Sequence, residues 1–250
     1  MGYIKKLFNN YIIGFGSVAS IIALLVIIFS DSWSTIIALS VICLLFILLF
    51  VRAIYVLNKF IDQENPNPYS KRSSFIKYEA IDKENINYHI YRLIQSKNLA
   101  LTKVEHKFDW TGDNYPEIES SLQDVEEIIK RGRDNYDKVI LKLKKPLWYN
   151  ETAVVHFNAK CFDPNQNSSP YVNMKVTTHI DMIHFRVVLK YVDANFGKNA
   201  QIYKKPFNSE LSGSFEPVES VSFDKETKSY EHVLLNPDVG FYYKIEWERE

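Results

Sequence analysis

The sequence YIIGFGSVASIIALLVIIFS at residues 11–30 is followed, after a very short connection, by a second apolar run, STIIALSVICLLFILLFV, at residues 34–51. Neither run contains a charged residue, and each is long enough for a helix to cross the roughly 30 Å core of a bilayer. Because the connection is so short, we expect two transmembrane helices paired as an antiparallel hairpin. Trp33, in the connection, would then lie at the level of the lipid headgroups.

Basic residues flank this predicted hairpin at both of its outer ends. Lys5 and Lys6 precede the first run, Arg52 and Lys59 follow the second, and the connection carries only Asp31. Cytoplasmic flanks are enriched in lysine and arginine, so we expect both termini in the cytoplasm. A cleaved signal peptide fits less well, because the first run is too long for a signal core and a second span follows at once.

Small residues in both runs would let helices approach closely. The spacing of Gly16 and Ser20 is a small-xxx-small pattern, which fits packing either inside the hairpin or between protomers. Two helices cannot enclose water by themselves, so a conducting state would need a homo-oligomer, a tetramer or larger. The residues that we expect to pack are Gly14, Gly16, Ser17 and Ser20 in the first run and Ala38 and Ser40 in the second.

The rest of the chain has the composition of a cytoplasmic domain. We expect the hairpin to occupy residues 1–61, a linker with Pro66 and Pro68 to occupy 62–84, and a β-domain to occupy 85–250. The chain has 30 basic and 30 acidic residues, and the first 59 residues hold four basic and one acidic, which leaves 26 basic and 29 acidic beyond them. This balance argues against a broad basic surface for duplex nucleic acid. The two cysteines, Cys43 and Cys161, lie in different environments and form no disulfide framework.

The C-terminal part alternates apolar and polar residues with period two, which is typical of half-buried antiparallel strands. In residues 152–161 we expect Val155 and Phe157 to face the core and His156 and Asn158 to face water. The stretch 121–132 fits either a short capped helix or a hairpin, and we favour the hairpin. We expect eight or nine strands in a β-sandwich or barrel, the clearest of them at residues 152–161, 171–180, 182–191 and 241–248. The upstream stretches 86–94, 101–110 and 136–144 also fit strands, with a weaker pattern.

No catalytic motif appears in the sequence. It lacks a nucleophile elbow, a phosphate-binding glycine loop, a zinc-protease helix and a paired-cysteine signature, so we expect neither an enzyme nor a metal or cofactor. His179 and Asp181 share a strand face and suit a solvated surface pair. The other histidines, among them His89, His106 and His156, are predicted to stand alone.

Three basic clusters are candidates for binding an anionic ligand. Arg131 and Arg133 lie in a predicted turn, where guanidinium groups can hold a phosphate. Lys142 and Lys144 precede Trp148 and Tyr149, whose rings could stack on a base. Lys204 and Lys205 are a third pair. For each cluster the competing interpretation is an ordinary solvated strand face, where lysine discourages aggregation of sheet edges.

The layout of the chain, together with KKPLWYNE at residues 144–151 and NPDVGFYYKIEW at 236–247, resembles the two-transmembrane, β-rich membrane effectors of bacterial anti-phage nucleotide-signalling systems of the CBASS type. The resemblance implies a multi-pass protein of the inner membrane that senses a nucleotide signal, oligomerises and disrupts the membrane. It also implies a ligand made by an operon-encoded nucleotidyltransferase, either a cyclic dinucleotide or a short DNA or RNA oligomer. The alternative is a membrane-anchored scaffold whose β-sandwich binds another protein. The sequons at Asn150 and Asn167 would instead suit a eukaryotic surface protein.

Overall fold

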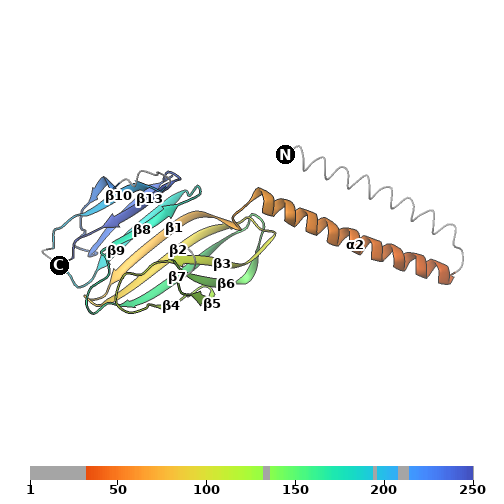
Figure 1. Cartoon of the computed structure of the whole chain (residues 1–250), viewed down its shortest axis with the longest axis horizontal. Helices are drawn as coiled ribbons and strands as arrows, with labels where there is room; N and C mark the ends of the chain where they lie inside the picture. The colour runs from red at the N-terminus through yellow and green to blue at the C-terminus, as the bar shows by residue number, and fades with distance from the viewer. Residues whose placement is uncertain (1–31, 132–135, 194–195, 208–213, 250) are drawn as a thin grey trace. The chain divides into compact units, whose positions relative to one another are not determined.

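The structure is a computed structural model that describes residues 32–131, 136–193, 196–207 and 214–249 (Figure 1). The first apolar run, with Gly14, Gly16, Ser17 and Ser20, lies outside the described residues, so the hairpin stays a prediction. The chain divides into two compact units, residues 1–60 and residues 61–250. The boundary falls close to the predicted end of the hairpin.

The second apolar run forms one long helix, α2 (Ser32–Glu64). Within the described part of the chain it is the helix that is long and apolar enough to cross a bilayer. Trp33 belongs to the first turn of this helix, with its side chain 74% exposed, and not to a connecting turn as expected. The helix continues past the apolar run and ends before Pro66, as predicted, and the backbone N–H of Asn65 donates to the carbonyl of Ile61 at 3.0 Å.

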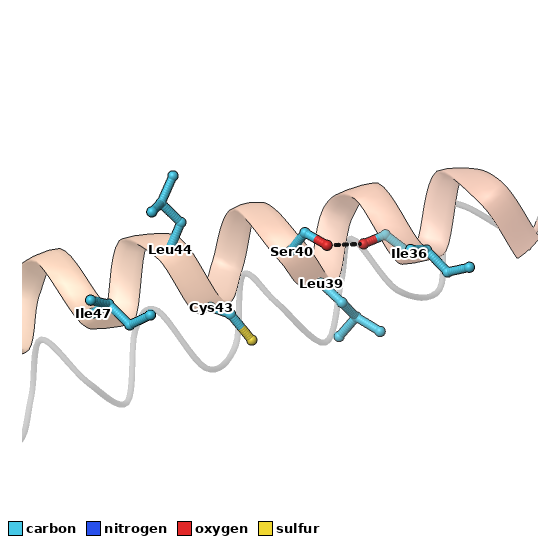
Figure 2. A pocket seen from close by; sticks show the side chains of 6 residues that line it. All are labelled: Ile36, Leu39, Ser40, Cys43, Leu44 and Ile47. Atoms are coloured by element: carbon cyan, nitrogen blue, oxygen red, sulfur yellow. Dashed lines mark hydrogen bonds between the residues drawn. The ribbon is translucent and has the colours of Figure 1, made fainter.

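One stripe of α2 forms a shallow, mostly apolar hollow (Figure 2). Ser40 lies in this stripe, and its hydroxyl donates to the carbonyl of Ile36 in the same helix at 2.9 Å. The hydroxyl is therefore already satisfied inside α2, and Ser40 offers mainly a small side chain to a neighbouring helix. The lining residues follow helical spacing and are Ile36, Leu39, Ser40, Cys43, Leu44 and Ile47.

The second unit is built from strands arranged in three sheets (Figure 1). The largest sheet has the order β12-β9-β1-β2-β7-β4, the second β11-β10-β13-β8 and the third β3-β6-β5. The strands are β1 (Tyr69–Ala80), β2 (Asn85–Ser96), β3 (Ala100–Phe108), β4 (Glu117–Glu119), β5 (Asp124–Ile129), β6 (Asp137–Trp148), β7 (Thr152–Phe162), β8 (Tyr171–Val176), β9 (Met182–Leu189), β10 (Ala200–Pro206), β11 (Glu216–Val221), β12 (Ser229–Leu235) and β13 (Phe241–Glu246).

The sheets share one apolar core and form a sandwich. Phe157 of β7 is 1% exposed and packs against Phe108 of β3, with ring centroids 5.3 Å apart. Tyr78 of β1 packs against Trp247, which follows β13, at 4.7 Å. The inner face of the largest sheet therefore contacts both smaller sheets. Burying a side chain such as Phe157 contributes about 2–3 kcal/mol.

The predicted linker at residues 62–84 is wrong, because Tyr69–Ala80 within it form strand β1. This strand lies inside the largest sheet, between β9 and β2. Its start reads Tyr-Ser-Lys-Arg-Ser-Ser and looks like a solvated linker, but Ile76, Tyr78 and Ala80 alternate into the core. The expectation of purely antiparallel sheets also needs correction. The pairing of β1 with β9 is parallel, while the other pairings among the described strands are antiparallel.

The middle of the outer face of β7 is not wet as expected, whereas Thr152 and Lys160 toward its ends are exposed. His156 and Asn158 are each only 3% exposed, because β4 pairs alongside Asn158 and the segment after β4 contacts His156. The backbone N–H of Ser121 donates to His156 Nδ1 at 2.9 Å, and Gln123 Oε1 accepts from the backbone N–H of His156 at 2.8 Å. Glu119 of β4 accepts from Asn158 Nδ2 at 2.7 Å. A segment distant in sequence has thus covered a face that alternation alone assigns to solvent.

The hairpin interpretation of residues 121–132 is confirmed, since β5 pairs antiparallel with β6. The described residues contain thirteen strands, more than the eight or nine expected. The additional ones include β1 and the short strands β4 and β11. The strand expected at residues 171–180 is shorter, because β8 ends at Val176.

Candidate nucleic-acid interface

The outward face of the β11-β10-β13-β8 sheet carries lysines interleaved with aromatic rings. Alternation sends Met174 of β8, Ile202 of β10 and Ile245 of β13 into the core, so the residues between them point outward. We call this surface the lysine–aromatic face. Its residues are Tyr171, Lys175, Tyr203, Lys205, Phe207, Phe215, Tyr242 and Lys244.

Strand register sets the alternation of cation and ring on this face. Tyr242 of β13 lies directly opposite Lys175 of β8 on one side and Lys205 of β10 on the other. In the next row Lys244 of β13 lies opposite Tyr203 of β10. Directly opposed side chains in antiparallel sheets lie close enough to interact. Cations and aromatic rings therefore neighbour one another both along and across the strands.

Each lysine of this face lies near at least one ring. Lys244 Nζ is 4.6 Å from the centroid of Tyr203 and 4.4 Å from that of Phe215. Lys175 Nζ is 4.1 Å from the centroid of Phe207. These distances lie within the roughly 6 Å at which an ammonium is attracted to a ring face. The lysines thus hold their charge at fixed positions above the sheet.

The lysines give the face positive charge, and a carboxylate offsets part of it. Lys244 forms an ion pair with Glu246 at 2.7 Å, which offsets part of its charge. Burial, followed by the nearby carboxylates of Asp109 and Glu246, raises the pKa of Tyr171. This phenol is consequently neutral at physiological pH, where its ring can stack and its hydroxyl can donate.

The predicted pair Lys204 and Lys205 is split by the strand. Lys205 belongs to the lysine–aromatic face, whereas Lys204 points to the other side of β10 and pairs with Asp238 at 2.5 Å. The hydrogen bond to Asp238 raises the pKa of Lys204. Consecutive strand residues point to opposite faces, which is why neighbours in sequence do not act together here.

The structure does not gather the other predicted binding residues into one site. Arg131 lies in the turn after β5 with a φ of 40°, and its backbone N–H donates to Asp137 at the start of β6. Trp148 and Tyr149 lie at the far end of β6, and their side chains are 56% and 44% exposed. The length of a twelve-residue strand separates the two groups. Arg133 lies outside the described residues.

Lys142 and Lys144 lie on the exposed face of β6 among charges of both signs. Lys142 pairs in register with Lys103 of β3 and with Asp124 of β5. Lys103 in turn forms an ion pair with Glu126 at 2.8 Å. A face of mixed charge fits the competing interpretation, an ordinary solvated sheet surface, better than it fits a phosphate-binding patch.

The histidines are less isolated than expected, but they do not form a catalytic group. His156 Nε2 lies 3.4 Å from His89 Nδ1, and Ser121 Oγ lies 2.9 Å from His156 Nδ1. The backbone N–H of Ser121 already donates to the same Nδ1, so this nitrogen cannot serve the hydroxyl freely as a base. Burial lowers the pKa of both His89 and His156. Their rings stack with Tyr91 across β2 and β7 and stabilise the sheet.

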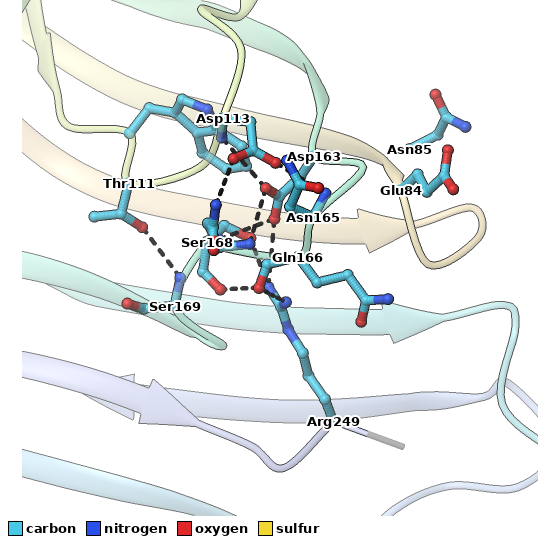
Figure 3. Close-up of polar contacts among 12 residues, drawn as sticks. Glu84, Asn85, Thr111, Asp113, Asp163, Asn165, Gln166, Ser168, Ser169 and Arg249 are labelled. Atoms are coloured by element: carbon cyan, nitrogen blue, oxygen red, sulfur yellow. Dashed lines mark hydrogen bonds and ion pairs between the residues drawn. The ribbon is translucent and has the colours of Figure 1, made fainter.

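The loop 163–170 contains a D-x-N-x-N spacing like the start of a calcium loop, at Asp163, Asn165 and Asn167. In the structure its carboxylate is already used (Figure 3). Asp163, which is 0% exposed, accepts from the backbone N–H groups of Asn167 and Ser168 at 3.1 and 2.9 Å and pairs with Arg249 at 3.7 Å. These contacts of Asp163 hold the loop in a fixed conformation, and we call them the Asp163 clasp. No cluster of three or more His, Cys, Asp or Glu side chains suited to a metal occurs among the described residues.

Sequence reasoning missed most of the lysine–aromatic face. Alternation places Lys244 on the outer side of its strand, but its neighbours Tyr203 and Phe215 come from another strand and from the loop before β11. The available signal was the pairing of lysine with aromatic residues in YKKPF at residues 203–207 and FYYK at 241–244.

Comparisons with known proteins assign no family. No family model matches the sequence, and no curated protein matches it. Among solved structures, an M1 zinc metallopeptidase from Deinococcus radiodurans is 9% identical with a TM-score of 0.36, over 72% of this chain and 43% of that one. Baculovirus P35 is 9% identical with a TM-score of 0.37, over 74% and 99%. The chain spans less than half of the peptidase, and similarity at this level carries no argument about function.

Proposed function

We propose that the protein is a membrane-anchored receptor whose β-domain binds a nucleotide or a short single-stranded oligonucleotide on the lysine–aromatic face. The observation that carries this proposal is the alternation of Lys175, Lys205 and Lys244 with aromatic rings on one sheet face. Ammonium groups attract phosphates, and rings stack on bases for about 1–3 kcal/mol per base. The mildly acidic balance of the rest of the domain favours a local site over a broad one.

The test is a binding titration with matched lysine variants of the full-length protein in detergent. The probes are a fluorescent oligothymidylate and a fluorescent cyclic dinucleotide, followed by anisotropy at several salt concentrations. The test variant is Lys175→Gln with Lys244→Gln, and the control is Lys142→Gln with Lys144→Gln on the mixed-charge face of β6. Each removes two positive charges from strands of the same domain, although the Lys244 side chain is only 12% exposed, whereas Lys142, Lys144 and Lys175 are exposed.

We expect the test variant to bind the oligonucleotide at least about tenfold more weakly. The slope of log affinity against log salt concentration should become shallower by about 0.7 for each phosphate that the protein no longer neutralises. The control should bind as the unmodified protein does. Equal losses in both variants, or unchanged binding by the test variant, would remove the lysine–aromatic face as the site. Binding of the cyclic dinucleotide alone would identify the smaller ligand.

We further propose that ligand binding favours assembly of the membrane helices into a membrane-disrupting pore, with both termini in the cytoplasm of a bacterial cell. The apolar length of α2 supports membrane insertion. A membrane-potential dye tests the effector role, since expression with the ligand should depolarise cells and the Lys175 and Lys244 double variant should not. If the unmodified protein does not depolarise cells, the effector role is wrong and the scaffold function is preferred.

The scaffold alternative rests on an edge of the largest sheet. Strand β12 is at the end of that sheet, and its outward side chains Val233 and Leu235 are 43% and 71% exposed. An exposed edge with apolar side chains can pair with a strand of another protein. Leu235→Lys should then abolish partner capture while leaving nucleotide binding intact.

A further inference from the structure

A small hollow between the largest sheet and the β3-β6-β5 sheet is lined by two nitrogen-bearing side chains in an otherwise apolar wall. Arg92 enters it from β2 and His106 from β3. His106 is 3% exposed, and its ring packs against Phe157 with centroids 4.2 Å apart. The remaining lining residues are aliphatic or aromatic and are Ile90, Ile94, Val104, Leu141, Val155 and Phe157.

Hydrogen bonding leaves several donors here without acceptors among the described residues. Arg92 Nη1 lies 2.5 Å from His106 Nδ1, so the guanidinium donates and Nδ1 accepts. The imidazole proton is then on Nε2, which is buried and has no partner. Arg92 Nε is buried without a partner as well, and so is the hydroxyl of Ser74, which lies directly opposite Arg92 in register. Buried donors of this kind each cost about 1–3 kcal/mol.

The positive charge of Arg92 in the hollow also lacks a nearby negative charge among the groups described below. Two phenols, those of Tyr69 and Tyr88, interact electrostatically with Arg92, and burial raises the pKa of both, so they carry no negative charge at neutral pH. A third basic group, Lys71, is close enough that Arg92, then burial, then Lys107 lower its pKa to about 7. A buried cation without a counter-charge is strongly unfavourable, so the hollow has the character of an anion site.

We propose that this hollow binds one small monovalent anion of about the size of chloride, held by Arg92 and by the N–H of His106, with Ser74 beside it. The cavity volume of about 10 Å³ is at the lower limit for one water molecule, and chloride is larger than water, so binding requires the lining side chains to move apart slightly. A phosphate or a nucleotide is too large for it, so this site is separate from the lysine–aromatic face. The anion neutralises the guanidinium and accepts from donors that lack partners.

The first test measures thermal unfolding of the full-length protein in detergent, with chloride replacing gluconate at constant ionic strength. A ligand that binds the folded state raises the unfolding midpoint as its concentration passes the Kd. We expect the midpoint to rise with chloride, and Arg92→Met to remove this response. The control is Arg72→Met on the neighbouring strand β1, where Arg72 Nη2 instead donates to Gln95 Oε1 at 2.6 Å, and the response should persist.

A second measurement does not depend on whether Arg92→Met folds. Crystals of the unmodified protein grown in bromide should show an anomalous peak between Arg92 and His106. An unfolding midpoint that does not respond to chloride, a response retained in Arg92→Met, or a hollow that holds only water in bromide crystals would each overturn the proposal.

Discussion

Asp163 shows how one buried carboxylate holds separate segments of the chain together. It accepts hydrogen bonds from its own loop, pairs with Arg249 near the C-terminus, and accepts from the backbone N–H of Asp113 at 3.3 Å (Figure 3). Burial by itself would raise its pKa, but the hydrogen bonds from Ser168, Asp113 and Asn167 outweigh burial and lower it. The folded state therefore stabilises the ionised form.

We predict that Asp163→Asn destabilises the protein by about 1–3 kcal/mol at neutral pH, because it removes charge-assisted hydrogen bonds and leaves Arg249 without its anion. Since the folded pKa lies below the unfolded value of 3.8, the contribution of Asp163 is complete above that pH and is lost as the pH falls through the folded pKa. Urea unfolding of the variant and the unmodified protein at neutral and acidic pH measures this.

The two stabilities should converge in acid. The control is Asp113→Asn, because Asp113 is exposed and its loss should cost less. If the difference in unfolding free energy between Asp163→Asn and the unmodified protein stays constant from neutral to acidic pH, packing and not charge stabilises the Asp163 clasp.

At the scale of elements, β1 lies in the interior of the largest sheet. It supplies the parallel pairing with β9 and the antiparallel pairing with β2, so it joins two parts of the largest sheet. Its polar first half conceals an inner face on which Ile76 is only 1% exposed. A strand with neighbours on both sides and an apolar inner face is expected to be part of the stable core.

We predict that Ile76→Ala lowers the free energy of unfolding by about 2–5 kcal/mol, because it removes buried methyl groups and leaves a cavity. The control Ile81→Ala lies just after β1, where the side chain is 44% exposed, and should change the value by less than about 0.5 kcal/mol. Denaturant unfolding followed by tryptophan fluorescence measures both. A similar small effect from the two substitutions would mean that residues 69–80 act as a linker after all.

At the scale of the whole molecule, the proposed function assigns different tasks to the helical segment and to the β-domain. The apolar side chains of α2 are largely exposed, as expected of a helix that faces lipid or other helices. The proposed receptor role places ligand recognition in the β-domain and assembly in the helices. Assembly should therefore depend on small residues in the membrane and not on the lysine–aromatic face alone.

We predict that Gly16→Leu or Ser20→Leu reduces the oligomer in detergent at least severalfold, because a large side chain keeps helix backbones apart. The control is Val18→Leu, which lies between them in sequence but on another face of the predicted helix. Mass measurement of the purified complexes gives the subunit number. A monomer for the unmodified protein, with and without nucleotide, would contradict both the oligomer and the pore.

Local patterns in the sequence were sufficient to predict several features. The uncharged run at residues 34–51 and the prolines after it predicted a helix that ends before Pro66, and the structure confirms it. Alternation predicted the inner face of β7 and the strands β9 and β13, and the turn signals predicted the hairpin of β5 and β6. These features depend on the conformational preferences of residues that are close in sequence, and the folded state keeps those local conformations.

Only the tertiary structure decided which strands are neighbours and which faces are covered. Alternation predicts on which face of a strand a side chain lies, but it does not predict which other segment packs against that face. His156 is buried by a segment distant in sequence, Arg92 meets His106 across two sheets, and Lys244 finds its rings on another strand and in the loop before β11. Strand register depends on long-range pairing and shared burial of apolar surface, which no local pattern encodes. For that reason the sequence determined the elements of this protein, and tertiary pairing determined its candidate sites.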